Sequence, residues 1–427
     1  KWSWKKHDAA WLFYHSSFEN EIDRIRAACP KLKQVICLDK PGIGHPFFDD
    51  FIAGFKAQAR ELPDCRDRVI CHFTSGGTTG QPKGAMWSNL TWEAWTANVY
   101  AHMPVKKPPV FLIAAPMSHG AGAFAWPALA FGATLVCIPQ AEPLAVLEAM
   151  HTYRVTHTFL PPTVVYMMLA HQRAKEFDFS AMDYLVYGGA PMSADKVKQG
   201  LNLFGPCMAQ IYGQVECPIT IGILSPDDHL EALSTPDKEK RLTSCGRPPV
   251  FVNVEMMDED GNLVSQGEWG EIVVRGTLVS LGYYGDPEAS EANRAHGWHH
   301  TGDIGYKDED GFIYIVDRKK DMIISGGLNV FPIEIERLIW SHPAVQDCAV
   351  IGVPDRKWGE AVKAVIELKS GQSVTEAEII ALCKNGLSTY KAPKTVEIWD
   401  ELPRSGIGKV LKRKIRDRFW AGHERKI

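Results

Sequence analysis

The segment TSGGTTGQPKG, residues 74–84, holds four glycines, four hydroxyl side chains and one lysine directly after the apolar run at residues 69–73. Glycines let backbone N–H groups approach an anion closely, while hydroxyl groups and a lysine add donors and positive charge. This composition suits a loop that binds phosphate, but it is also common in plain surface turns. The segment matches neither the Walker pattern nor G-x-G-x-x-G, and Gly80 is followed by Gln81 rather than lysine. Whether it binds phosphate therefore depends on what the rest of the chain offers.

Five further segments carry residue types suited to the same chemistry. Carboxylates bind Mg²⁺ or accept hydrogen bonds from hydroxyl groups, and lysine and arginine neutralise phosphate charge. Taken alone, each segment also fits an ordinary turn or a solvated surface. In chain order they are YGGAP (187–191), YGQVE (212–216), TGD (301–303), DRKKD (317–321) and PRSGIGK (403–409).

The overall composition is that of a soluble globular protein and argues against a nucleic-acid partner. Of 427 residues, 45% are hydrophobic and 23% are charged, and the length predicts roughly three average-sized units. The net charge of −4, without a long basic run, does not indicate a nucleic-acid surface. Ten scattered cysteines without a C-x-x-C pair indicate free thiols in a reducing cytoplasm, and the start of the chain shows no signal peptide.

The most apolar stretch, residues 108–139, is long enough to span a bilayer. Prolines, glycines and a histidine interrupt it, so we predict strands at 110–115 and 134–138 with a helix between them. No transmembrane segment is expected. Alternation continues with strands at 156–160 and 184–187 and helices at 164–170 and 194–204, which predicts parallel βαβ units.

From residue 247 the pattern becomes antiparallel, with Asp-Gly turns expected at 260–261 and 310–311. A small α/β unit follows and ends in a basic helix, where Lys412 and Lys414 suggest a solvated tail. The chain is thus predicted to be α/β. A large ATP- and acid-binding domain is expected over 1–317, with parallel sheets and a small antiparallel region, and a small mobile domain over 318–427.

Together, and in this order, the six motifs resemble the adenylate-forming superfamily, most closely its acyl- and aryl-CoA ligases. The resemblance runs from about Asp64 to Phe419. It implies an enzyme that joins a carboxylic acid to ATP as an acyl-adenylate, releases pyrophosphate, and then passes the acyl group to CoA with release of AMP. ATP, Mg²⁺ and CoA are the implied cofactors and co-substrates.

The resemblance implies an ATP site drawn from several motifs. Thr78 and its loop would bind the β- and γ-phosphates, Glu216 would bind Mg²⁺, and Asp303 would accept both ribose hydroxyls. Tyr212 would stack on adenine. Gly76 replaces a usual serine and Val215 a usual threonine. The implied ATP-binding residues are Ser75, Gly76, Gly77, Thr78, Thr79, Gly80, Lys83, Gly188, Gly189, Ala190, Tyr212, Gly213, Gln214, Asp303, Arg318 and Lys409.

The remaining implied roles concern catalysis, the acid and CoA. Lys409 would bridge the acyl carboxylate and the α-phosphate during adenylation only, because the small domain rotates about a hinge at Lys320. Catalytic residues would be Lys409, Glu216 and Thr78. The acid would contact His119, Phe124 and Gly188, in an apolar and wide pocket that Trp126 and Gly189 also line. CoA would contact Gly326, Gly327, Trp358, Tyr390 and Lys394.

Several alternatives stay open. A peptide-synthetase adenylation domain would need a carboxylate for an amino group, and GAGAFAWPALAFG offers none. A nucleotide-binding relative without turnover would not need Lys409, Glu216 and Asp303 together. HGWHH, residues 296–300, has the composition of a metal site, but we interpret it as a family loop rather than a zinc site. The usual first subdomain of the family is expected to be missing before Ala10. The identity of the acid and a homodimeric state are left open.

Overall fold

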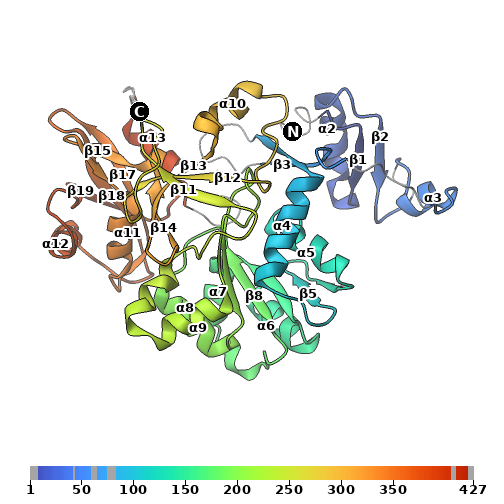
Figure 1. Cartoon of the computed structure of the whole chain (residues 1–427), viewed down its shortest axis with the longest axis horizontal. Helices are drawn as coiled ribbons and strands as arrows, with labels where there is room; N and C mark the ends of the chain where they lie inside the picture. The colour runs from blue at the N-terminus through green and yellow to red at the C-terminus, as the bar shows by residue number, and fades with distance from the viewer. Residues whose placement is uncertain (1–7, 42–43, 59–64, 75–82, 405–409, 422–427) are drawn as a thin grey trace.

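The computed structural model describes residues 8–41, 44–58, 65–74, 83–404 and 410–421. Its centre is a six-stranded sheet, flanked along the chain by a small N-terminal unit, a four-stranded antiparallel sheet and a C-terminal five-stranded sheet (Figure 1). The predicted α/β class is confirmed. None of the helices in these ranges combines the length and the hydropathy that a bilayer span requires.

The six-stranded sheet has the order β10-β9-β8-β7-β5-β6, and its neighbours pair in parallel except β10, which is antiparallel to β9. Parallel strands bring their carboxyl ends to one edge of a sheet, where ligands bind in such folds. Gly188 ends β8 and Tyr212 ends β9, so two of the motifs meet at this edge. The strands are β5 (Val110–Ile113), β6 (Thr134–Cys137), β7 (His157–Leu160), β8 (Tyr184–Gly188), β9 (Met208–Tyr212) and β10 (Gly222–Leu224).

Helices connect these strands and cover both faces of the sheet. The cluster on one face centres on Trp95, Phe124 and Ile211, and the cluster on the other face on Leu147, Met168 and Leu185. Both faces are apolar, as parallel strands require. The helices are α4 (Asn89–His102), α5 (Gly120–Ala130), α6 (Pro143–Thr152), α7 (Pro162–Ala170), α8 (Ala194–Phe204) and α9 (Pro226–Ser234). The predicted interruption of the apolar stretch 108–139 is confirmed, since it forms β5, α5 and β6.

Before this sheet the chain forms two small units. Strands β1 and β2 pair in parallel, and β3 and β4 form an antiparallel pair that precedes and follows residues 75–82. Strand β4 leads directly into α4, which Ser88 caps by accepting from the Thr91 N–H. The elements are β1 (Trp11–Tyr14), α2 (Ile22–Ala28), β2 (Gln34–Cys37), α3 (Phe48–Ala53), β3 (Val69–Thr74) and β4 (Gly84–Ser88).

The antiparallel sheet has the order β11-β12-β13-β14. The predicted turn at 310–311 joins β13 to β14, and Gly311 has the positive φ of 83° that such a turn requires. The turn at 260–261 does not join β11 to β12 directly. Asp258 accepts from the backbone N–H groups of Asp260 and Asn262, which turns the chain back early into a short bridge at Leu263. The elements are β11 (Asn253–Met257), β12 (Gly270–Arg275), α10 (Pro287–Ala292), β13 (His299–Lys307) and β14 (Ile313–Arg318).

The C-terminal sheet has the order β16-β15-β18-β17, with β19 parallel to β18. The chain changes sheet between Arg318, the last residue of β14, and Ile323, the first of β15. A single 3₁₀ turn, Lys319–Asp321, connects them. The elements are β15 (Ile323–Ser325), β16 (Leu328–Val330), α11 (Pro332–Trp340), β17 (Val345–Asp355), β18 (Gly359–Leu368), α12 (Glu376–Gly386), β19 (Thr395–Trp399) and α13 (Lys412–Phe419).

The basic helix α13 is not the solvated tail that its sequence suggests. Ile415 is fully buried against the outer face of β17 and β18. The Lys412 Nζ lies 2.8 Å from the carboxylate of Glu336, which is only 1% exposed. The interpretation of Lys412 as one more surface charge is therefore wrong, because a buried carboxylate needs this partner. Lys414, on the same helix, is exposed.

A buried histidine gives the large domain a predictable response to acid. His229 on α9 contacts the Tyr187 hydroxyl at 2.9 Å and the Ser225 carbonyl at 2.7 Å. Burial lowers the pKa of His229 from 6.5 to about 4. In the unfolded chain His229 therefore binds a proton below about pH 6.5, whereas in the folded chain it stays neutral down to about pH 4. The free energy of unfolding consequently falls as the pH drops from 6.5 to 4.

We expect the free energy of unfolding to fall by about 2 kcal/mol between pH 7 and pH 5 through this residue alone. Urea titrations at the two pH values measure it. In His229→Gln, which has no titrating group there, the pH-dependent loss should shrink by that amount. An unchanged pH slope in the variant would contradict the buried neutral histidine.

Candidate active site

Asp303 lies at the centre of the site, and the structure brings three motifs to it. Its carboxylate is 1% exposed. Oδ2 accepts from the Tyr212 hydroxyl at 2.7 Å and from the Gln214 Nε2 at 3.0 Å. The Arg318 Nε lies 2.5 Å from Oδ1, because Asp303 and Arg318 are register partners on β13 and β14. YGQVE, TGD and DRKKD therefore converge on one carboxylate.

The protonation of this cluster follows from its burial. Burial and the neighbouring carboxylate of Asp303 hold the pKa of Tyr212 well above its usual value. Tyr212 is therefore a neutral hydrogen-bond donor at any physiological pH. Asp303 thus pairs with an arginine through one oxygen and accepts from two neutral donors through the other.

The YGGAP segment forms a close backbone wall beside this cluster. A Cβ at Gly188 would lie 2.5 Å from the carbonyl oxygen of Ile211, so no larger residue fits against β9. Gly189 has a φ of 82°, which L-residues with side chains rarely adopt. Ala190 is half-buried at the end of the segment. The two glycines let the chain pass directly over the end of Tyr212's strand.

Glu216 is held by a tyrosine that sequence reasoning missed. The Tyr283 hydroxyl donates to Glu216 Oε1 at 2.8 Å, and the Ser280 N–H donates to the Glu216 carbonyl at 2.8 Å. The Lys83 ammonium lies 4.9 Å from the centre of the Tyr283 ring, a cation–π contact. Tyr283 thus connects the end of the glycine-rich loop to the YGQVE carboxylate. Its position in LGYYGDPEAS gave no chemical signal, because the partners lie far away in the sequence.

The chain at residues 280–284 reaches this place by pairing with β4. The Met86 N–H donates to the Gly282 carbonyl, the Leu281 N–H to the Met86 carbonyl and the Tyr284 N–H to the Gly84 carbonyl. The Trp87 indole Nε1 donates to the Val215 carbonyl at 2.7 Å. The strand that follows the glycine-rich loop is therefore fixed to both the Tyr283 segment and the YGQVE segment.

Among residues 8–41, 44–58, 65–74, 83–404 and 410–421, no three His, Cys, Asp or Glu side chains gather as a metal site would need. Glu216 does fit a Mg²⁺ ion that takes most of its ligands from phosphate and water, since Mg²⁺ usually uses one or two protein carboxylates.

Within HGWHH, His299 contacts Asn293 and Gln214, and His300 contacts Glu271 and a backbone carbonyl.

Removing the Tyr283 hydroxyl should loosen the Glu216 carboxylate. In Tyr283→Phe, we expect Mg²⁺ to bind about tenfold more weakly in the presence of a non-hydrolysable ATP analogue, as for one lost hydrogen bond to a charged group. Calorimetric titration of Mg²⁺ measures it. Tyr284→Phe is the matched control, because that hydroxyl contacts Asp8 instead, at 3.3 Å. Equal Mg²⁺ affinity in both variants would contradict the expectation that Tyr283 helps Glu216 to bind Mg²⁺.

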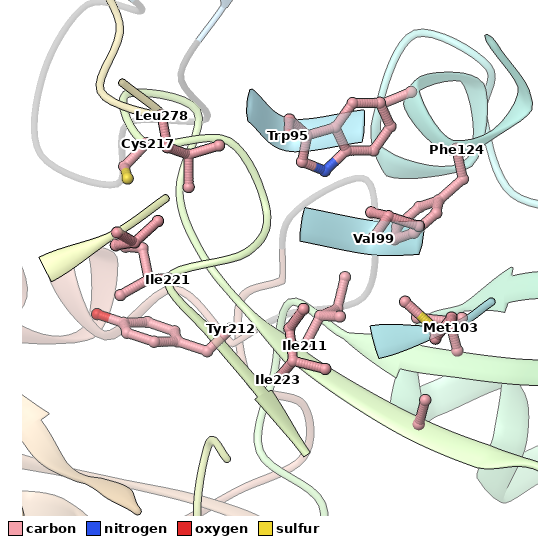
Figure 2. Packing of buried hydrophobic residues seen from close by; sticks show 14 of the residues in the cluster. Trp95, Val99, Met103, Phe124, Ile211, Tyr212, Cys217, Ile221, Ile223 and Leu278 are labelled. Atoms are coloured by element: carbon pink, nitrogen blue, oxygen red, sulfur yellow. The ribbon is translucent and has the colours of Figure 1, made fainter. Parts of the chain in front are cut away.

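Phe124 and Trp126, which the sequence predicts to line the acid pocket, differ in their burial. Phe124 is buried and its ring centroid lies 5.5 Å from Trp95 and 5.4 Å from Phe159. Figure 2 shows Trp95 and Phe124 on one side of the apolar cluster and Tyr212 on the other. Trp126 is 65% exposed and does not join Phe124, because residues two apart on a helix face different sides. The role of Trp126 in an acid pocket stays a prediction.

Two further residues of this region are His119, which is exposed, and Trp95, which is buried. His119 is exposed at the start of α5, where its Nδ1 lies 2.9 Å from the Ser118 Oγ. Trp95, which the sequence analysis did not single out, is fully buried in the cluster. Its indole Nε1 has no hydrogen-bond partner in the part of the chain that the structure describes. The burial of Trp95 follows from the helical spacing of Thr91, Trp95 and Asn98 on α4.

In the C-terminal sheet the structure brings together three of the residues predicted to contact CoA. Gly326 and Gly327 form the turn between β15 and β16, with φ of 60° and 80°. The Gly326 N–H donates to the Trp358 carbonyl at 2.8 Å, and a Cβ at Gly326 would lie 2.6 Å from the Trp358 ring. Tyr390 and Lys394 are exposed in the segment between α12 and β19. The predicted hinge residue, Lys320, lies in the 3₁₀ turn between the two sheets.

Other predicted site residues lie outside the described residues. These are the phosphate-loop residues Ser75, Gly76, Gly77, Thr78, Thr79 and Gly80, and the adenylation lysine, Lys409.

Comparison with known proteins agrees with this architecture. Residues 5–284 match the AMP-binding enzyme family, and residues 334–409 match the AMP-binding enzyme C-terminal domain. The chain is similar to the medium/long-chain-fatty-acid–CoA ligase FadD8 of Mycobacterium tuberculosis, with 40% identity over 86% of this chain and 64% of that protein. It thus spans less than two thirds of FadD8. It is also similar to a feruloyl-CoA synthase of an Amycolatopsis species, with 39% identity over 84% of this chain and 72% of that protein.

Solved structures give the same result. ATP-bound MatB from Rhodopseudomonas palustris matches with a TM-score of 0.87 and 27% identity, over 99% of this chain and 82% of that chain. The amide bond synthetase McbA from Marinactinospora thermotolerans matches with a TM-score of 0.84 and 32% identity, over 96% of this chain and 80% of that chain. The fold is that of an adenylate-forming enzyme. The chain belongs to the AMP-binding enzyme family.

Proposed function

We propose that the protein is an ATP-dependent ligase that activates a hydrophobic carboxylic acid, fatty or aromatic, and joins it to CoA. The observation that carries this proposal is the convergence of Tyr212, Gln214 and Arg318 on Asp303, within a chain of the AMP-binding family. The similarity to FadD8 and to feruloyl-CoA synthase supports the class of acid and the CoA acceptor.

The proposed reaction has two half-reactions. A carboxylate is a poor electrophile because its leaving group would be oxide, so a carboxylate oxygen first attacks the α-phosphorus of ATP and pyrophosphate leaves. The CoA thiolate then attacks the acyl carbon, and AMP leaves with the C–O bonding electrons. Most of the catalysis is positioning and charge stabilisation.

In this scheme the described residues have separate tasks. Asp303 and Arg318 hold the ribose, Tyr212 and residues 188–190 enclose the adenine, and Glu216 holds Mg²⁺, which neutralises phosphate charge. Ribose hydroxyl groups reach the buried Asp303 by replacing one of its protein donors, and the half-exposed Arg318 is the most accessible of these. Ser75–Gly80 and Lys83 bind the β- and γ-phosphates.

The domain assignment is also part of the proposal. We assign residues 1–317 to the large domain and 318–427 to a small domain that rotates about Lys320. The change of sheet between Arg318 and Ile323 supports this boundary. We place the enzyme in the cytoplasm, where ATP and CoA are available, and ten unpaired cysteines suit a reducing compartment.

A second candidate keeps the first half-reaction and changes the acceptor. The match to McbA supports an amine acceptor and an amide product. The glycine turn at Gly326–Gly327 beside Trp358 supports CoA instead, because backbone without side chains gives a narrow thiol arm room to pass. Product analysis with CoA and with amines separates the two.

The ribose assignment makes a direct prediction. Asp303→Ala should weaken ATP binding by about 1.5–3 kcal/mol, the value of hydrogen bonds to a charged group. Calorimetry with ATP measures the change, and ATP–pyrophosphate exchange in the unmodified protein tests turnover. Wild-type ATP affinity in the variant would overturn the ribose assignment.

A further inference from the structure

The HGWHH segment contains a buried histidine with no part in the scheme above. His299 is 3% exposed and begins β13, four residues before Asp303. Its two ring nitrogens face two amide side chains. Nδ1 lies 2.8 Å from the Asn293 Nδ2, and Nε2 lies 3.4 Å from the Gln214 Oε1. Asn293 is itself anchored, because its carbonyl accepts from the His300 N–H at 3.0 Å.

The donors and acceptors among Asn293, His299 and Gln214 follow from the partners of Gln214. The Gln214 Nε2 faces the Thr301 carbonyl at 2.7 Å and the Asp303 carboxylate at 3.0 Å, which are both acceptors only. The Gln214 amide group must therefore present its oxygen to His299. The His299 Nε2 must carry the proton, and its Nδ1 must accept from Asn293. Only a neutral imidazole can do both.

The burial of His299 also favours its neutral form. The environment lowers the pKa of His299 from 6.5 to about 4, first through burial and then through the neighbouring His300 and Arg294. The ring is therefore neutral at physiological pH. A hydrogen-bonded chain from Asn293 through His299 and Gln214 ends on Oδ2 of Asp303, where Tyr212 also donates.

We propose that His299 is a positioning residue for ribose recognition: it orients the Gln214 amide so that its N–H, and not its oxygen, faces Asp303. This inference rests on the proposed role of Asp303 in binding ATP. Without His299, the Gln214 oxygen loses its donor. The amide can then turn its oxygen toward the carboxylate, where two acceptors repel each other and Asp303 moves from its ribose-binding orientation.

The experiment compares ATP with 3′-deoxy-ATP and 2′-deoxy-ATP, each titrated calorimetrically into intact protein. The unmodified protein should prefer ATP by about tenfold over each analogue, as for one hydrogen bond to a carboxylate. His299→Leu keeps an apolar side chain of similar size. It should bind ATP roughly fivefold to tenfold more weakly and prefer ATP over each analogue by less than about threefold.

Two further variants separate positioning from simple filling of space. His299→Gln retains a donor near the place of Nε2 and should recover most of the ribose preference. His157→Leu is the matched control. His157 is a half-buried histidine whose pKa burial also lowers to about 4, but it begins β7, at the opposite end of the sheet from the site. It should keep the full preference, and thermal unfolding of each variant shows whether it is folded.

The outcomes distinguish this inference from the proposed function. If the unmodified protein binds ATP and both analogues equally, Asp303 does not bind ribose and the proposed site is wrong. If the unmodified protein prefers ATP and His299→Leu prefers it equally, the positioning role alone is overturned. If His299→Gln behaves like His299→Leu, the hydrogen bond to Gln214 is not what matters, and the inference also fails.

Discussion

Lys409→Ala should lose adenylation and keep thioester formation. If this lysine joins the acyl carboxylate to the α-phosphate, its loss removes one preorganised charge contact from the first transition state. We expect ATP–pyrophosphate exchange to fall by about 10²–10³-fold. The same variant, given synthetic acyl-adenylate and CoA, should form thioester at close to the normal rate, because the lysine serves only the first half-reaction in this account.

Gly327→Leu is the reciprocal variant. Gly327 has a φ of 80° and no atom within 4 Å of an added Cβ, so a side chain there extends into open space beside the turn. We expect it to obstruct the CoA thiol arm and slow thioester formation, with adenylation mostly intact. If Lys409→Ala slows both half-reactions equally, the assignment of Lys409 to adenylation alone is wrong for this protein.

Lys412→Ala should destabilise the C-terminal sheet strongly. Lys412 is the charged partner of Glu336, whose carboxylate is buried and also accepts from the Val350 N–H at 2.7 Å. Although burial alone would lower it, the carboxylates of Glu336 and Asp317 raise the pKa of Lys412. Removing the lysine leaves a buried, unpaired charge, which costs about 3–5 kcal/mol. Urea unfolding measures the loss.

Two comparisons make this result specific. Lys414→Ala, on the exposed side of the same helix, should change the free energy of unfolding by less than about 0.5 kcal/mol. The double variant Lys412→Met and Glu336→Gln should recover much of the loss, because it removes both charges and keeps an acceptor for Val350. If Lys412→Ala is as mild as Lys414→Ala, the buried ion pair contributes nothing.

The sequence predicted the order of the elements because that order is written in local patterns: alternating apolar runs and helices predict parallel strands. Asp303 and Arg318 became candidate site residues only through the resemblance of the six ordered motifs to a known family, since TGD or DRKKD alone also fits an ordinary turn. Their contact then follows from the β13–β14 hairpin, which the turn at Gly311 also predicts. Local sequence patterns thus predict the structure where residues that are close in the sequence are also close in space.

The residues that sequence reasoning missed act through partners far away in the chain. Tyr283 reaches Glu216, and His299 reaches Gln214, across separations of 67 and 85 residues. Tyr283 stands in no pattern with its own chemistry, and the HGWHH pattern around His299 suggests a metal site rather than a contact with Gln214. Lys412 was misjudged for the same reason, because a lysine among basic residues suggests solvent until the fold places Glu336, 76 residues earlier, against it.

The most direct test of the account is a product analysis with ATP, Mg²⁺, CoA and a panel of acids. The panel includes medium- and long-chain fatty acids, ferulate and indoleacetate, whose ligases the chain resembles. We predict that at least one acid gives equal amounts of AMP, pyrophosphate and acyl-CoA, and that omitting CoA stops AMP release but not ATP–pyrophosphate exchange. ADP and phosphate as products, or no exchange with any acid while ATP still binds, would contradict the assignment as an acyl-CoA ligase.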